Sequence, residues 1–138
     1  MSDAQNERVS HRRPHSPTMA APYLEFDLVR ELEQLHREPE WQTGQNARTL
    51  VKYDTLRVVL TSLKAHARIP EHRTEGRISI QALRGRIHVR AEGRTFDLSA
   101  GTLLALDQGI SHDVEALEDS AFLLIIAWPG STHGSAAR

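Results

Sequence analysis

The chain has 138 residues, the length of one ordinary domain. Its 17 Lys and Arg residues nearly balance its 18 Asp and Glu residues, and the net charge of −1 provides no general attraction to nucleic acid or anionic lipid. The absence of cysteine excludes disulfides, thiol catalysis and thiolate metal sites, so any metal must be held by imidazole and oxygen ligands. We therefore expect no nucleic-acid partner, and the histidines are the first candidates for chemistry.

Both ends of the chain are polar. Residues 1–20 lack the apolar core of a secretory signal, and we expect them to form a disordered N-terminal tail. Residues 130–138 are expected to form a flexible C-terminal tail. The longest apolar run, Ala121 to Trp128, is too short to cross a membrane as a helix. These features predict a cytoplasmic protein with no membrane partner.

One amphipathic helix is predicted over residues 23–38. Its apolar stripe consists of four leucines at helical spacing: Leu24, Leu28, Leu32 and Leu35. Pro22 suits the first turn, and Pro39 marks the end because proline disfavours helical geometry in the residue before it. We assign residues 21–44 to this helix and its linker, and we expect the helix to pack against a larger body.

The rest of the chain, residues 45–129, is predicted to be one all-β domain. Short runs of β-branched and apolar residues are separated by turn signals such as Glu92-Gly93. Between Arg77 and Leu83, apolar and polar residues alternate, which places Ile78 on a buried face. About eight or nine short strands with no intervening helix indicate an antiparallel sandwich or barrel rather than a parallel α/β sheet.

Two histidines occupy positions where a barrel would hold a site. His72 is expected at the start of the strand region that contains Arg77–Leu83, and His112 begins a later strand. We expect them to face each other from two strands, because a barrel brings inward side chains together at its mouth. Neutral imidazole is the commonest metal ligand and the usual general base near neutral pH.

The spacing around these histidines resembles the two sequence motifs of the cupin superfamily, in particular its small single-domain members. The first motif runs from glycine through His-x-His and glutamate to glycine, and its positions hold His66, His72, Thr74, Ile78 and Gly85. The second runs from glycine through Pro-x-Gly and histidine to asparagine, and its positions hold Gly101, Asp107, Gly109, His112 and Ala116. The resemblance implies an all-β cupin-type double-stranded β-helix, a jelly-roll barrel, here with one N-terminal α-helix. It also implies a scaffold that commonly forms homodimers.

The resemblance carries an expectation about metal. In the family, two histidines and a glutamate of the first motif and the histidine of the second generally hold the ion. This chain keeps His72 and His112 at two of these positions, while Thr74 and Ile78 replace a histidine and the glutamate. We therefore expect one weakly bound divalent ion (iron, manganese, nickel or zinc) on the two histidines, or none. Thr74, Ile78 and His66 are expected to line the ligand pocket, with His66 joining the metal ligands if a bent strand brings it near.

Three functions stay open. The leading prediction is binding of a small-molecule ligand, or of a loosely held divalent metal, inside the barrel. The first alternative is a metal-dependent cupin enzyme, a dioxygenase or isomerase, that uses His72 and His112 as ligands. The second is a non-catalytic regulatory or interaction module. Motifs of nucleotide-binding, zinc-protease and serine-hydrolase sites do not occur in the sequence.

Overall fold

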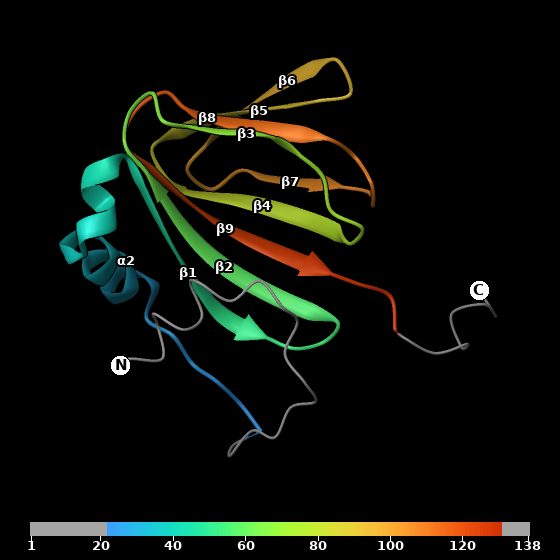
Figure 1. Cartoon of the computed structure of the whole chain (residues 1–138), viewed down its shortest axis with the longest axis horizontal. Coiled ribbons are helices and arrows are strands. Elements are labelled where there is room, and N and C mark those ends of the chain that lie inside the picture. Colours follow the sequence, from blue (N-terminus) through green and yellow to red (C-terminus); the bar gives the residue numbers. More distant parts are fainter. Residues whose placement is uncertain (1–21, 131–138) are drawn as a thin grey trace.

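The computed structural model describes residues 22–130, so the predicted tails, apart from Gly130, lie outside the described residues. In this part of the chain two short helices precede nine strands (Figure 1). The elements are α2 (Leu28–Arg37), the 3-10 helix η1 (Pro39–Thr43), β1 (Gln45–Lys52), β2 (Leu56–Leu63), β3 (Arg68–His72), β4 (Arg77–Arg84), β5 (Arg86–Ala91), β6 (Arg94–Ser99), β7 (Leu103–Leu106), β8 (His112–Ala116) and β9 (Ser120–Ala127). Neither of the helices between residues 22 and 130 is long and apolar enough to span a bilayer.

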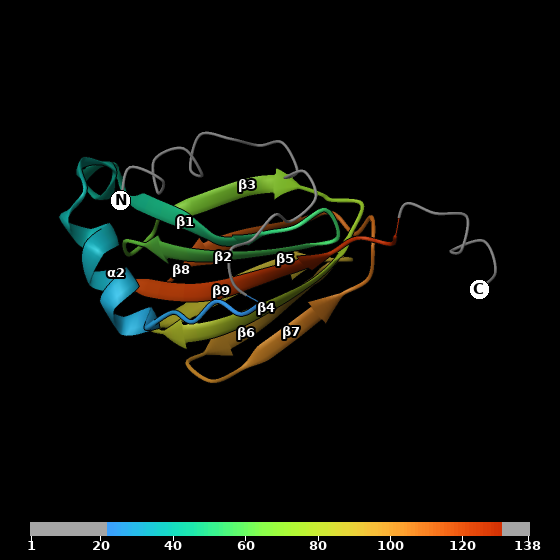
Figure 2. The same cartoon turned by 90° about the horizontal axis from the view of Figure 1, so that it is seen from below.

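The strands form two antiparallel sheets packed face to face (Figures 1 and 2). The first sheet has five strands in the order β1-β2-β9-β4-β7, and the second has four in the order β3-β8-β5-β6. This arrangement confirms the predicted all-β jelly-roll class with one N-terminal α-helix. The crossovers between the sheets bring residues far apart in sequence to the same end of the barrel.

An apolar interior fills the space between the two sheets. The predicted alternation in β4 is confirmed, since Ile78, Ile80 and Ala82 are buried there. Their neighbours on β9 are Ile126, Leu124 and Phe122. The second sheet contributes a matching set of buried residues: Ile87, Val89, Leu98, Val114 and Ala116. Burial of each large aliphatic side chain stabilises the fold by about 1.5–3 kcal/mol, so this interior dominates its stability.

Helix α2 covers the outer face of the first sheet, as Figure 1 shows. Leu32 and Leu35 are buried against Leu60, in agreement with the predicted packing of the helix on a larger body. The helix begins later than predicted, because the Asp27 side chain accepts a hydrogen bond from the backbone N–H of Arg30 and caps the first turn. The prediction that Pro22 occupies the first turn is therefore wrong.

The strand that carries His72 also differs from the prediction. His72 ends a separate strand, β3, rather than starting the next one. Four of the five β3 residues are solvent-exposed, so this strand shows no alternation of apolar and polar residues that could reveal it. Pro70 is tolerated because β3 lies at the edge of its sheet, where an N–H is not required on the outer side.

A buried ionic cluster attaches α2 to β1. Arg48 lies under the helix with a side chain only 7% exposed and pairs with Glu38, while a second carboxylate oxygen, from Glu31, lies 3.5 Å away. Asn46 donates hydrogen bonds to Glu38 and to the Leu35 carbonyl, each 2.9 Å long. Asn46 thus satisfies a backbone acceptor at the C-terminal end of the helix, and Glu38 compensates the buried charge of Arg48.

His66 takes the left-handed backbone conformation, with φ of 73°, at the motif position that glycine normally holds. It lies in the turn between β2 and β3, where its N–H donates to the Ala116 carbonyl. A residue with a Cβ atom pays a steric cost in this region that glycine does not.

The buried cluster makes a prediction about stability. Replacement of Arg48 by methionine removes a buried guanidinium and its ion pair with the part-buried Glu38 carboxylate, so we expect the free energy of unfolding to fall by about 3 kcal/mol. Urea denaturation of both proteins measures this. The matched control is Arg77→Met, because Arg77 pairs with Asp107 while 69% exposed. The control is expected to change stability by less than about 1 kcal/mol, and equal losses in both variants would contradict the argument.

The strained turn makes a second prediction. His66→Gly relieves the left-handed strain but increases the freedom of the unfolded chain, and we expect a net gain of about 0.5–1 kcal/mol in the free energy of unfolding. Thermal or urea denaturation measures the change. His66→Ala is the control: it removes the imidazole but keeps the Cβ atom, so it should not share the gain. A stabilised alanine variant would place the effect in the side chain instead.

Candidate functional site

One end of the barrel collects the loops that carry most of the polar chemistry. We call it the mouth: turns 53–55 and 92–93, loops 73–76 and 107–111, and the segment 128–130. The strand registers place these segments together. In the first sheet, Arg57, Ile126, Ile78 and Leu106 are paired across four strands at this end. In the second sheet, His72, His112 and Ala91 are paired in the same way.

His72 and His112 meet at the mouth, as the sequence predicted. They are direct partners across β3 and β8, and their ring centroids are 4.4 Å apart with the planes inclined at 57°. His112 is buried on the same face of β8 as Val114, which points into the interior. His72 lies at the exposed rim. The pair therefore spans from the apolar interior to the solvent.

Both imidazoles are held by the same kind of hydrogen bond. Nδ1 of His72 lies 2.9 Å from the Pro70 carbonyl oxygen, and Nδ1 of His112 lies 3.0 Å from that of Ile110. A carbonyl only accepts, so each Nδ1 must carry the proton and donate it. In the neutral ring the lone pair is then on Nε2, which is the arrangement that orients histidine as a metal ligand.

The electrostatic surroundings favour neutral His112. Burial lowers the pKa of His112, and the neighbouring His72 lowers it further, while the hydrogen bond to the Ile110 carbonyl opposes these effects. Proton competition at Nε2 of His112 is therefore weak near neutral pH.

Three other predicted pocket residues are dispersed. Thr74 is close to the histidines in sequence, but its Oγ1 accepts a hydrogen bond from the Gly76 N–H and its carbonyl accepts one from Gly109. Ile78 is 5% exposed and belongs to the apolar interior. His66 is exposed at the opposite end of β8 from His112, about 13 Å along the strand. The structure does not bring His66 to the pair, because the strand that follows it runs straight toward the mouth.

The donors present fit a weak metal site and do not fit a complete four-ligand cupin centre. Between residues 22 and 130, no three His, Asp or Glu side chains are grouped so that they could hold one ion. Ile78 supplies an apolar wall where the motif has a carboxylate, so charge compensation is lost along with a ligand. Two imidazole nitrogens remain, and the hydroxyl groups nearest to them in sequence belong to Ser111 and Thr74.

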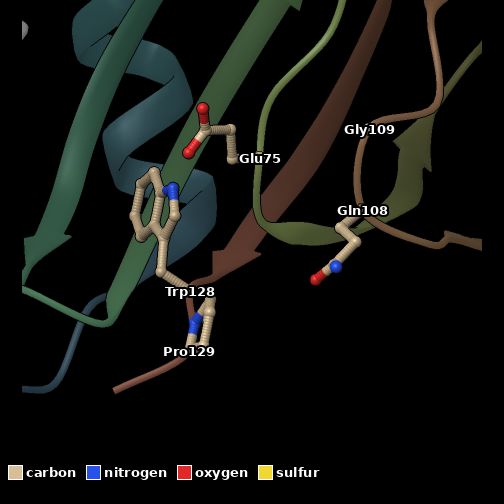
Figure 3. A pocket seen from close by; sticks show the side chains of 5 residues that line it. All are labelled: Glu75, Gln108, Gly109, Trp128 and Pro129. Atoms are coloured by element: carbon tan, nitrogen blue, oxygen red, sulfur yellow. The ribbon is translucent and has the colours of Figure 1, made fainter. Parts of the chain in front are cut away.

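A cavity of about 680 Å³ opens among the loops of the mouth. Figure 3 shows the five residues that line it: Glu75, Gln108, Gly109, Trp128 and Pro129. Sequence reasoning missed these residues as a site. Gln108-Gly109 was visible as a turn within the second motif and Trp128 as the end of an apolar run, and no sequence pattern indicates that they meet.

Comparison with known proteins identifies the fold. The chain is similar to a conserved protein of unknown function from Streptococcus pyogenes, with a TM-score of 0.65 and 21% identity over 86% of this chain and 97% of that one. It is similar to a cupin superfamily protein from Desulfitobacterium hafniense, with a TM-score of 0.60 and 16% identity over 62% of this chain and 78% of that one. A third similar structure is salicylate 1,2-dioxygenase from Pseudoaminobacter salicylatoxidans, with a TM-score of 0.67 and 15% identity over 74% of this chain and 32% of that one.

These likenesses rest on structure. No protein-family model and no curated protein sequence matches the chain. Loss of the second histidine and the glutamate from the first motif is consistent with that result, since these residues carry much of the motif's information. At the identities above, structural similarity establishes architecture and leaves activity open. The chain is a small protein with the cupin fold.

Proposed function

We propose that the protein binds one divalent metal ion weakly through Nε2 of His72 and His112, and that the remaining coordination positions serve a small chelating ligand. The observation that carries this proposal is the matched pair of Nδ1 hydrogen bonds, which leaves both Nε2 lone pairs available on adjacent rings. Surface histidines without such anchors rotate freely and lose entropy on binding an ion.

The separation of the rings supports a shared ion. With metal–nitrogen bonds of about 2.1 Å, two imidazoles bound at right angles to one ion have ring centroids about 4.6 Å apart. The observed separation of 4.4 Å is close to this value, which supports the binding of one ion by both rings. A tetrahedral angle requires a wider spacing, about 5.3 Å.

The chemistry of the two imidazole ligands also determines which metals bind most tightly. Two neutral imidazoles with no carboxylate favour nickel, zinc and ferrous iron over manganese, which prefers oxygen ligands. Because most positions around the ion are left to water, affinity should be modest and should increase when an oxyacid chelates the same ion. If an ion were bound, His72 and His112 would hold it, and the ion would supply Lewis acidity to such a ligand.

The test is titration of the purified full chain with Ni²⁺, Zn²⁺ and Mn²⁺ by calorimetry. We expect one ion per chain, nickel and zinc binding more tightly than manganese, and weaker binding at pH 5.5 than at pH 7.5 because protons compete for Nε2. His72→Ala and His112→Ala should each weaken binding by at least about tenfold. His66→Ala is the matched control, since His66 is an exposed histidine away from the pair, and it should bind as the parent does.

Two outcomes would change the assignment. Absence of binding, or equal loss in the His66 variant, rejects the two-histidine site and leaves an organic ligand or a protein partner. Turnover of small oxyacids or diketones by the iron-loaded protein would support the metal-dependent enzyme instead. The fold likeness to a dioxygenase, whose structure contains gentisate adducts, is the reason for including an aromatic oxyacid among the compounds.

A further inference from the structure

We propose that the outer edge of β7 binds the same edge of a second copy of this chain, with the two strands antiparallel about a two-fold axis at Leu104. β7 is the last strand of the first sheet, and Figure 2 shows it at the border of that sheet, beyond β4. No strand within residues 22–130 pairs with its other side. An edge strand presents unpaired N–H and C=O groups, which can pair with another chain.

The composition of β7 distinguishes it from the other edge strands. Of the four edge strands in the described part of the chain, β7 alone has no charged residue, and it reads Leu-Leu-Ala-Leu. The other three carry charges: Arg48 and Lys52 on β1, Arg68 and Glu71 on β3, and Arg94 and Asp97 on β6. Charged residues on an edge oppose pairing with a further strand, so β7 is the edge that remains suited to it.

Exposed apolar side chains accompany this edge. Leu103 and Ala105 pair with Gln81 and Ser79, which alternate with the buried isoleucines of β4. Both side chains therefore lie on the outer face of the first sheet. Leu103 is 60% exposed, and Ala105 is also exposed. Pairing of two β7 strands would remove part of this apolar surface from water, which favours association.

The hydrogen bonds between β4 and the turn before β7 show which way the backbone groups point. The Ala82 N–H donates to the Thr102 carbonyl at 2.9 Å, and the Ala82 carbonyl accepts from the Gly101 N–H at 2.7 Å. Both backbone groups of Ala82 therefore point toward β7. Because this direction alternates along a strand, the backbone groups of Ile80 and Ile78 also point toward β7.

The same alternation identifies the outward groups of β7. The partners of the two isoleucines are Leu104 and Leu106, so the N–H and C=O groups of these leucines face β4. The N–H and C=O groups of Leu103 and Ala105 consequently point away from the sheet. These two residues form the hydrogen-bonding edge that a second strand would meet.

One symmetric register uses both outward residues within the strand. It places Leu103 opposite the partner's Ala105 and Ala105 opposite the partner's Leu103, and each of these pairs exchanges both N–H···O bonds. The two-fold axis then passes beside Leu104. Registers centred on Leu103 or on Ala105 would instead require Gly101, whose N–H already donates to β4, or Asp107, which lies beyond the strand.

A second copy suits this edge because the edge complements itself. In this register apolar residues face apolar residues, and no like charges lie opposite each other. Self-pairing at any of the other three edges would bring two copies of a charged strand together. A two-fold axis also closes the assembly at two chains, which prevents growth into a fibre through this contact.

Sedimentation velocity of the full chain in EDTA measures the association. Paired strands of four residues bury less than the roughly 1,200 Å² of a stable interface, so we expect a reversible dimer with a dissociation constant of about 10–500 µM. EDTA prevents metal ions from bridging exposed histidines of two chains. The measurement is therefore independent of the proposed metal site.

Single cysteines test the register, because the chain has none of its own. In the proposed dimer the two copies of residue 104 form a pair without mutual hydrogen bonds, with Cα atoms about 4.5 Å apart, which a disulfide can span. The two copies of residue 103 are about 8–9 Å apart, which is too far. Under mild oxidation, Leu104→Cys should form a linked dimer at least about tenfold faster than Leu103→Cys, although Leu103 is the more exposed.

A proline variant tests the outward hydrogen bonds. Ala105→Pro removes an N–H that points away from β4, so it should preserve the fold and weaken the dimer at least about fivefold. The matched control is Thr95→Pro on the exposed edge strand β6. The Thr95 N–H also faces outward, because the backbone groups of its partner Arg90 point toward β8. This control should dimerise as the parent does, and circular dichroism verifies the fold of each variant.

Three results would overturn the proposal. The first is a chain that stays monomeric in EDTA at the highest concentration. The second is cross-linking of Leu103→Cys as fast as that of Leu104→Cys, which indicates random collision or another register. The third is a folded Ala105→Pro variant that dimerises as strongly as Thr95→Pro.

Discussion

The apolar interior shared by the two sheets is the constraint on which the rest of the structure depends. Residues from β4 and β9 meet those of β5 and β8 across it, and the alternation along each strand determines which side chains face inward. Ile78 is part of this interior, at the position where the cupin motif has a carboxylate. An ionised carboxylate there would need a counter-charge, whereas isoleucine adds apolar area and favours folding. Isoleucine at this position therefore favours the stability of the barrel and removes a ligand from the cupin motif.

The interior is apolar, and the paired histidines lie at its edge, at the mouth. The segments that join β3 to β4 and β7 to β8 adjoin the two histidines and contribute Glu75, Gln108 and Gly109 to the cavity, and one hydrogen bond from Gly109 to Thr74 connects those segments. Carbonyl acceptors fix the two imidazoles, whereas the proposed contact with a second copy lies along the β7 edge of the first sheet. The two proposals can therefore succeed or fail separately.

Much of the fold follows from local patterns. Alternation in β4 and the turn signals between strands predict an antiparallel barrel, and the leucine stripe predicts a helix that packs on it. The errors occur where local signals are weak. Strand β3 is exposed at a sheet edge and contains Pro70, so it lacks alternation; the start of α2 depends on the Asp27 cap rather than on Pro22. In α2 a single capping hydrogen bond sets the first turn, and in β3 pairing with β8 forms a strand that no local pattern indicates.

The sequence by itself determined the β-rich class, the inward face of β4, the exclusion of thiolate chemistry, and His72 and His112 as the histidines to examine. Only the tertiary structure decided that these two histidines are cross-strand partners whose Nδ1 atoms are held by hydrogen bonds. It also decided that His66 lies at the far end of the barrel. The cavity lined by Glu75, Gln108 and Trp128 likewise follows only from the tertiary structure. The physical reason is the distance along the chain over which each of these signals acts. Alternation and turn preferences act over a few residues, whereas strand register and loop packing depend on contacts between residues far apart in the chain.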